Sequence, residues 1–166
     1  MDERRAAALV EPQHEFLRWF DGIVISGREG LVKPEHAIFE LLAARYGFGL
    51  FLAISGGPAA RFAPYIDLFE QALDELGVER RPIAIHSPGL IAENDDDARA
   101  VVHDGWFAMR SQIGKERGWP PPAPGDFERE IRTGALYVGS PETVARKIAD
   151  TLKVLRVNRF DLKYDQ

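Results

Sequence analysis

Two short apolar runs in this chain each end at a glycine-containing turn that leads into an amphipathic segment. The first is Leu50–Ile54 (LFLAI), which is followed by Ser55-Gly56-Gly57-Pro58. The second, residues 135–138, meets Gly139-Ser140-Pro141-Glu142, where serine can cap a helix and proline suits its first turn. Such runs are typical of buried parallel strands that precede helices. Because α/β proteins bind anions where strand ends meet helix N-termini, the pattern indicates a ligand-binding α/β enzyme.

Composition narrows the class of protein. The 166 residues, 45% hydrophobic and 28% charged, suit a single α/β domain over 1–166 but fall short of a complete eight-stranded α/β barrel. A net charge of −5 and scattered basic residues argue against a nucleic-acid partner. The chain has no cysteine for a disulfide or thiolate metal site. It also lacks an apolar run of about 18 residues and a secretory-type N-terminus, so we expect a cytoplasmic protein without a membrane partner.

The pattern along the chain predicts alternating strands and helices. In the first part we expect helices over 15–20 and 35–46, with a short strand over 22–25 between them. An apolar stripe at helical spacing then predicts a helix that ends at Gly77. The stripe consists of Phe62, Ile66, Phe69, Leu73 and Leu76. A strand over 82–92, broken at residues 87–89, should follow.

Three consecutive acids, Asp95–Asp97, suit the positive end of the next helix. Neighbouring helical residues point in different directions, so this role is favoured over convergent metal ligation, and we expect no metal site. The predicted inner face of this helix consists of Ala98, Val102, Trp106, Met109 and Ile113. The proline-rich residues 118–125 predict an extended connector.

The last part of the chain predicts one more helix and a closing strand. The helix carries an apolar stripe of Val144, Ile148, Leu152 and Leu155, and residues 159–164 alternate apolar and polar side chains. The strand-helix order predicts a mostly parallel sheet flanked by helices. Asp161 and Lys163 share one face of the last strand, where they can point into a barrel or form pairs at a sheet edge.

Three stretches of the sequence resemble consecutive pieces of the bacterial luciferase-like, flavin-dependent monooxygenase family. They are YGFGLFLAISGGPAARFAPYIDLFEQALDELG, RPIAIHSPGLIAENDDDARA and GALYVGSPETVARKIADTLKVLRVNRFDLKY. The resemblance covers about residues 46–164 and implies the carboxyl-terminal half of a (β/α)8 TIM barrel. The first 45 residues differ from the family, and nothing in them matches its amino-terminal half. The expected fold is therefore a partial barrel.

The resemblance implies a flavin at the carboxyl ends of the strands, either FMN or the deazaflavin F420, and a small organic substrate. Small residues suit a flat ring that needs close backbone approach and amide donors. The residues implied at the isoalloxazine pocket are Ala53, Ile54, Ser55, Gly56 and Gly57. His86 and Ser87 would lie at the end of the next strand. The family's strand with a phosphate-binding loop is represented at best by GIVISGREG, which makes Ser26, Gly27 and Arg28 candidate phosphate ligands, although an ordinary surface turn would look the same.

Two polar residues, His86 and Arg61, each allow two interpretations. His86 can act as a general acid or hydrogen-bond the flavin, because imidazole titrates near neutral pH, but a structural histidine fits equally well. Arg61 can reach a phosphate, although a solvated helix-face arginine is the simpler interpretation. Since half a barrel leaves two bare parallel edges, we also expect a homodimer or larger assembly, or a complementary half-barrel chain.

Three functions remain open on the sequence alone. The first is a flavin-dependent monooxygenase or other oxidoreductase, in which the protein shields the cofactor chemistry from water. The second is a module that binds flavin or another phosphate-bearing ligand without turnover. The third is a catalytically silent fragment stabilised by self-association. The sequence has no hydrolase, metalloprotease or nucleotide-binding motif to support those classes.

Overall fold

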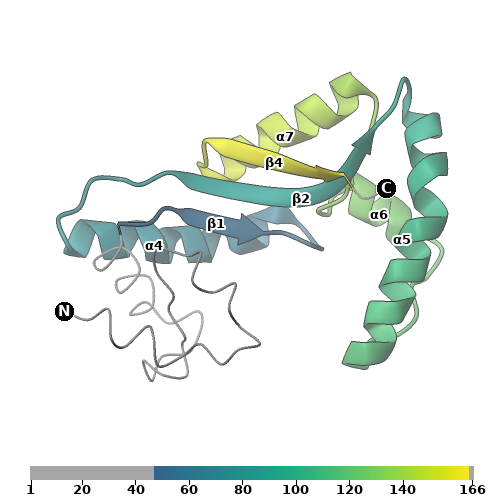
Figure 1. Ribbon diagram of the computed structural model, residues 1–166, viewed down its shortest axis with the longest axis horizontal. Coiled ribbons are helices and arrows are strands. Elements are labelled where there is room, and N and C mark those ends of the chain that lie inside the picture. Colours follow the sequence, from purple (N-terminus) through teal and green to yellow (C-terminus); the bar gives the residue numbers. More distant parts are fainter. Residues whose placement is uncertain (1–46, 165–166) are drawn as a thin grey trace, which may run out of the picture.

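The computed structural model of the protein describes residues 47–164 and shows a parallel sheet with helices around it (Figure 1). The predicted helices over 15–20 and 35–46 and the predicted strand over 22–25 lie outside this part of the chain. In chain order the elements are β1 (Leu50–Ala53), η2 (Ala59–Phe62), α4 (Ala63–Glu75), β2 (Ile83–Ile91), α5 (Asp95–Arg117), α6 (Asp126–Arg132), β3 (Tyr137–Gly139), α7 (Pro141–Leu155) and β4 (Arg159–Tyr164).

Strand β2 lies at the centre of the sheet and pairs with the other three strands, always in parallel. Both β1 and β4 pair with the segment Ala84–His86 of β2, so they must occupy its two opposite edges, as Figure 1 shows. β3 pairs only with the last residues of β2, Gly89–Ile91. Within residues 47–164, β1 and β4 have no further strand partner, and the sheet is open rather than closed.

The main core lies between one face of the sheet and helices α4 and α7. Alternate strand residues point to opposite faces. Ile83 and Ile85 of β2 are at most 2% exposed, and Leu50, Leu52 and Phe160 of the flanking strands pack with them. The helices bring Ile66, Phe69, Ala72, Leu73 and Leu155 to the same core. Truncating a buried residue such as Phe69 to alanine should cost about 3–5 kcal/mol.

A second core forms where β2 and β3 end. There α5 and α6 pack Trp106, Phe127 and Ile131 against Leu136 and Val138. The long helix α5 stands at the carboxyl end of β2 and extends well away from the sheet (Figure 1). Two expected inner-face residues, Ala98 and Trp106, are buried, but Met109 is 40% exposed. That expectation was wrong because only part of one side of this helix meets the core.

The predicted break in the second strand was also wrong, since β2 runs without interruption through Pro88. Ile54 N donates to His86 O, and continuation of this ladder would make position 88 the donor to Ile54 O. Proline has no N–H, and the Ser87 hydroxyl donates to Ile54 O instead, at 2.9 Å. The side chain of the neighbouring residue therefore replaces the missing bond, and the strand continues.

The helix ends follow the capping rules that the sequence suggested. Ser140 caps α7 by accepting from Thr143 N, and Pro141 is its first residue. Gly77 has a φ of +63° directly after the cap of α4, as a glycine in this position should. The connector over 118–125 is free of helix and strand. The short helix α6 was not predicted, because seven residues give too little periodicity.

Candidate functional site

Three residues form a row across the open face of the sheet. Ala53 on β1, His86 on β2 and Asp161 on β4 are direct pairing partners, and partners in register point to the same face. The neighbouring row contains Phe51 and Arg159. This is the face opposite to the main core. Phe51 is 51% exposed there, and His86 is half-buried. The polar groups of this face therefore lie around the middle of β2 and in the first half of β4.

The contacts of this row hold its imidazole and carboxylate in fixed surroundings. The Phe51 ring meets the His86 ring edge-on, with their centroids 5.5 Å apart. Arg159 donates to both carboxylate oxygens of Asp161, at 2.8 and 3.0 Å. These hydrogen bonds, together with the charges of Arg159 and His86, lower the pKa of Asp161, so it is an anion at neutral pH.

Two of the predicted site residues direct their side chains to the core. Ile54 and Ser87 are both 0% exposed, and the Ser87 hydroxyl donates to Ile54 O. This hydrogen bond joins the end of β1 to the middle of β2, so the expectation that His86 and Ser87 lie at the end of their strand was wrong. Ala53 and Ser55, in contrast, are exposed, and the alternation places Ala53 with His86. The structure thus brings Ala53 and His86 together on the open face and separates Ile54 and Ser87 from them.

The loop Ser55–Gly57 offers two backbone amides. The Gly57 amide is already bound by the two carboxylate oxygens of Glu130, at 3.1 and 3.2 Å. Within residues 47–164, the amides of Ser55 and Gly56 donate to no group. A Cβ built on Gly56 would meet no atom within 4 Å, so there is open space beside it. A ligand with acceptor atoms can therefore approach this loop closely.

Arg61 follows the same loop, and its guanidinium contacts Gly56 O at 3.5 Å and the Phe62 ring at 5.5 Å. Its side chain closes over Gly57, where an added Cβ would lie 2.8 Å from the guanidinium. Gly57 itself has a φ of +72°, which favours glycine. Arg61 thus lies beside the loop, in reach of an anion bound there.

Lys147 on α7 joins three elements behind the loop. Its ammonium donates to the carbonyl oxygens of Glu130 and Ile131, at the end of α6, and of Leu136, at 3.1, 2.6 and 2.8 Å. It also lies 4.6 Å from the centre of the Tyr137 ring. Burial lowers the pKa of Lys147 to about 8, while the nearby Glu130 charge opposes this shift. The same lysine therefore fixes the helix that holds Gly57.

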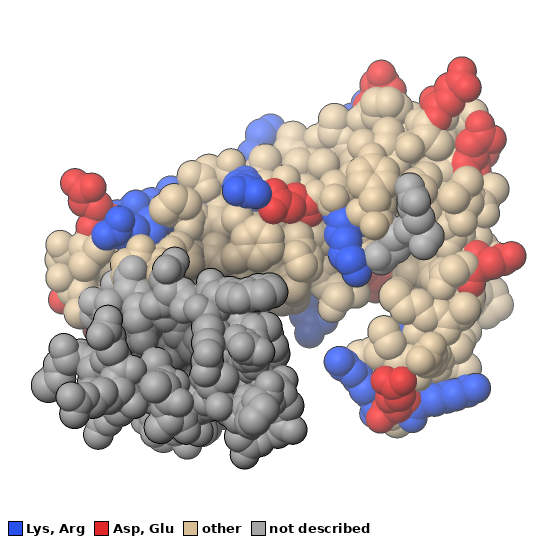
Figure 2. Space-filling model, in the orientation of Figure 1, with Lys and Arg blue, Asp and Glu red and all other residues tan. Residues whose placement is uncertain are grey.

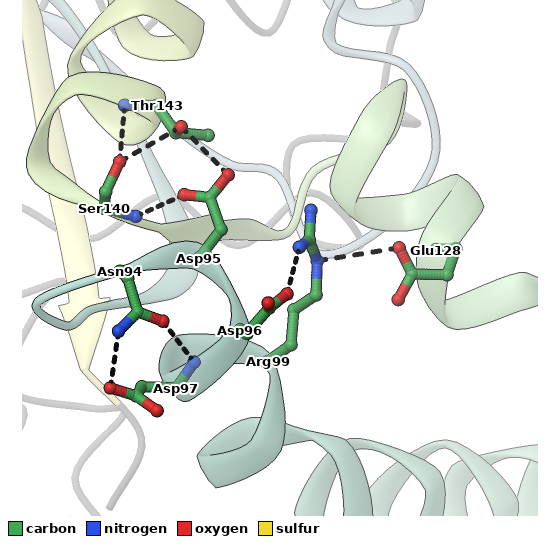
Figure 3. Close-up of polar contacts among 8 residues, drawn as sticks. All are labelled: Asn94, Asp95, Asp96, Asp97, Arg99, Glu128, Ser140 and Thr143. Carbon is green, nitrogen blue, oxygen red and sulfur yellow. Dashed lines mark hydrogen bonds and ion pairs between the residues drawn. The ribbon is translucent and has the colours of Figure 1, made fainter.

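The predicted helix-start acids divide into different roles, which Figure 3 shows. Asn94 caps α5 by accepting from Asp97 N at 2.9 Å. Asp95 reaches across to α7, where its carboxylate accepts from Ser140 N at 2.7 Å and from the Thr143 hydroxyl at 3.2 Å. The Ser140 amide is the main reason that the pKa of Asp95 lies below its usual value. Asp95 thus connects the starts of two helices.

The remaining predictions concern a phosphate loop, metal ligands, membrane helices and surface charge. Ser26, Gly27 and Arg28 lie outside the described residues. Within residues 47–164, no group of histidines and acids is arranged to hold a metal ion, and no helix is both long and apolar enough to cross a membrane. On the face shown in Figure 2, basic and acidic side chains are interspersed over the coloured part of the surface.

Sequence reasoning identified Asp161 as a residue that can face a barrel interior, but it did not connect Asp161 to His86. The signal was available in the alternation of β4, and only the strand register was missing. Glu130 was missed altogether, because its helix was not predicted. Its carboxylate binds Gly57 and also accepts from Ala135 N, at 3.2 Å. Such a long-range contact leaves no local sequence pattern.

Comparison with known proteins gives likeness of structure only. No protein-family model matches the chain, and no curated protein matches it. Among solved structures, it is similar to the FMN-complexed oxygenating constituent of 3,6-diketocamphane monooxygenase, a type II Baeyer–Villiger enzyme from Pseudomonas putida (TM-score 0.58, 19% identity, 76% of this chain and 38% of that chain). It is also similar to the monooxygenase RslO1 of Streptomyces bottropensis (TM-score 0.59, 24% identity, 80% of this chain and 39% of that chain).

A third similar structure is that of apo-MsnO8 (TM-score 0.55, 16% identity, 96% of this chain and 60% of that chain). The chain thus spans less than two fifths of the first two proteins. At these identities the likeness establishes the fold. The predicted fold class is confirmed: the described residues form an open, parallel α/β sheet flanked by helices, which resembles part of each of these structures.

Proposed function

We propose that this chain provides part of a flavin site in a luciferase-like oxidoreductase, with FMN as the cofactor and F420 as the alternative. The observation that carries the proposal is the row Ala53–His86–Asp161 on the open sheet face, next to the amides of Ser55 and Gly56, which donate to no group within residues 47–164. Two of the similar proteins are monooxygenases, and one of them was solved in complex with FMN. We propose monooxygenase activity for the assembled protein on the same basis.

The described residues fit a flavin in shape and in hydrogen bonding. A flat ring needs small residues beside it, and Ala53 and Gly56 leave open space. The polar edge or the phosphate of a flavin needs donors, and the Ser55 and Gly56 amides are available. Arg61 adds a cation near the same loop, in keeping with a negatively charged ligand group. Glu130 holds Gly57 in place rather than binding the ligand.

A bound flavin supplies hydride transfer or oxygen activation. The chain's own residues have three tasks around it. His86 can hold or transfer a proton, because neutral imidazole has one donor and one acceptor nitrogen. Asp161, fixed by Arg159, places a carboxylate in the same row as the imidazole. Phe51 contacts the imidazole edge-on and places an apolar ring beside it.

We also propose that the chain acts in the cytoplasm and that a second chain associates with its sheet. In the described residues, β1 and β4 each pair with β2 alone, which leaves the outer edges of both strands without a partner. Bare strand edges and an open polar face favour association. A homodimer or a complementary half-barrel chain would cover the face that carries His86. We therefore expect flavin binding to be strongest in the associated form.

The first test is a fluorescence titration of the purified chain with FMN and with F420, with the oligomeric state measured by light scattering on the same sample. The decisive variant is Gly56→Val, because its side chain enters the open space that the ring or phosphate should occupy. Gly105→Val is the matched control, since Gly105 on α5 is equally open and lies away from the sheet face. Both variants should keep the wild-type circular dichroism spectrum.

We expect saturable flavin binding that weakens about tenfold or more in Gly56→Val and stays within about twofold in Gly105→Val. The second arm is oxygen consumption or hydride transfer by the loaded protein, which should fall in His86→Ala while flavin binding persists. Binding without turnover would instead support the non-catalytic ligand-binding module. A chain that binds neither flavin in any assembly state would contradict the proposal and support the silent fragment.

A further inference from the structure

A cavity of about 560 Å³ lies between η2, α6 and α7. None of the residues that line it belongs to the row Ala53–His86–Asp161. The apolar part of its wall comes from Ala59, Ala60, Ile131 and Val154. This volume is in the range of pockets that hold small organic molecules. The cavity is therefore separate from the open sheet face that carries His86, and it is large enough for a ligand of its own.

Most polar groups in the wall are already engaged. Lys147 donates to three carbonyl oxygens. The Thr133, Thr143 and Thr151 hydroxyls donate to Arg129 O, to Asp95 and to Lys147 O. Arg99 forms ion pairs with Asp96 at 3.2 Å and with Glu128 at 3.7 Å, as Figure 3 shows. These groups build the wall and leave few donors for a ligand.

Two guanidinium groups in the wall have no polar partner in the part of the chain that the structure describes. Arg132 at the end of α6 and Arg146 on α7 are exposed, and within residues 47–164 neither forms a hydrogen bond or an ion pair. The buried Nε–H of Arg99 also donates no hydrogen bond. The acids of the wall are Glu128, which is paired with Arg99, and Asp150. Together with Lys147, the arginines therefore give the cavity an excess of positive charge.

We propose that this cavity binds a small organic anion, whose apolar body lies against Ala59, Ala60 and Val154 and whose anionic group is bound by Arg132 and Arg146. Guanidinium groups suit a carboxylate, sulfonate or phosphate, because their fixed N–H donors can bind two acceptor oxygens at once. The apolar wall demands a hydrophobic body, since Val154 is 53% exposed and gains from being covered. An inorganic ion alone would satisfy only one half of the site.

The test uses two fluorescent probes with the same kind of apolar body. One is 8-anilinonaphthalene-1-sulfonate, which carries an anion, and the other is N-phenyl-1-naphthylamine, which does not. The decisive variant is the double substitution Arg132→Gln with Arg146→Gln. The control is Arg129→Gln, because Arg129 on α6 pairs with Asp126 and does not line the cavity. Near-ultraviolet circular dichroism checks that each variant is folded.

We expect saturable binding of the sulfonate with one site per chain. Its affinity should fall about tenfold or more in the double variant and less than about twofold in Arg129→Gln. The neutral probe should bind the wild type and the double variant alike. Flavin affinity should be the same in the wild type, the double variant and Arg129→Gln. Equal sulfonate binding in all variants, an equal loss for both probes, or no saturable sulfonate binding by the wild type would overturn the proposal.

A second variant tests the apolar wall in case the double substitution disturbs folding. Val154→Asp places a carboxylate at an exposed position of α7 within the cavity, and should weaken both probes about tenfold or more. Val101→Asp is its control, because Val101 is 67% exposed on α5 and lies outside the cavity. Unchanged binding in Val154→Asp would overturn the proposal independently of the arginines.

Discussion

The carboxylate of Glu130 on α6 binds the amide of Gly57, which precedes it by 73 residues. The same carboxylate accepts from Ala135 N, just before β3. One side chain thus connects the end of β1 to the start of β3. The loop that we propose as part of the flavin site therefore depends on a helix outside that site.

Replacing Glu130 by alanine should leave the Gly57 and Ala135 amides without an acceptor. We expect the free energy of unfolding in urea to fall by roughly 1–3 kcal/mol, and hydrogen exchange of the Gly57 amide to accelerate. Glu128→Ala is the control, since the one polar contact of Glu128 within residues 47–164 is its ion pair with Arg99 at 3.7 Å, and it should change stability by about 0.5 kcal/mol or less. An unchanged Gly57 exchange rate in Glu130→Ala would contradict this account.

Gly139 should not tolerate a side chain. A Cβ there would lie 2.8 Å from Asp95 Oδ1 and 2.9 Å from Thr143 Cγ2, and its φ is +155°. We expect Gly139→Ala to reduce the free energy of unfolding by about 1–3 kcal/mol. Gly105→Ala, in the open middle of α5, should be neutral or stabilising by up to about 1 kcal/mol. Thermal or urea unfolding measures both, and similar effects of the two variants would argue against the close contact.

Asp95 should make the protein sensitive to acid. Because the Ser140 amide lowers its pKa in the folded state, its carboxylate stabilises the fold above the unfolded-state pKa, and that contribution disappears as the pH falls through the lower folded value. The melting temperature of the wild type should exceed that of Asp95→Asn at about pH 6, and the difference should shrink towards about pH 2.5. Asp96→Asn should show no such convergence, since the Asp96 side chain is 95% exposed.

Lys147 should make stability rise with pH as well, but in the alkaline range. Its folded-state pKa of about 8 lies below the ordinary value of 10.5, so between these values the unfolded chain binds more protons than the folded protein. The free energy of unfolding should therefore rise with pH in this window. Urea unfolding at several pH values should show this contribution in the wild type but not in Lys147→Met. If wild-type stability fell relative to the variant, the carbonyl contacts of the ammonium would outweigh its burial.

Much of the fold was predictable because its signals are local. The residues Leu50–Ile54 gave the position of β1, and alternation over 159–164 gave β4. Ser140 and Pro141 marked the start of α7. The continuity of β2 was not predictable, because the Ser87 hydroxyl compensates for Pro88 only when β1 lies beside it. A tertiary contact there overrides the local breaker signal.

The candidate site was only partly predictable for a related reason. The sequence placed Ala53 and Gly56 at a strand end, where α/β proteins bind ligands, but it also placed His86 there, and His86 lies in the middle of β2. It could not show that Ile54 and Ser87 point into the core, because that depends on the phase of each strand against its neighbours. It also could not connect His86 with Asp161, since no periodicity reports the pairing of strands far apart in the chain.

The in-register pairing of β2 and β4 has a consequence for how this sequence can vary. A shift of β4 by one residue would turn Asp161 towards the core and expose Phe160, since successive strand residues face opposite sides. Only Arg156–Asn158 separate α7 from β4, and Arg156 already has a φ of 54°. An insertion or deletion in this three-residue turn would therefore remove the acid from the neighbourhood of His86 without replacing either residue. The length of the turn is as much a requirement of the site as the side chains themselves.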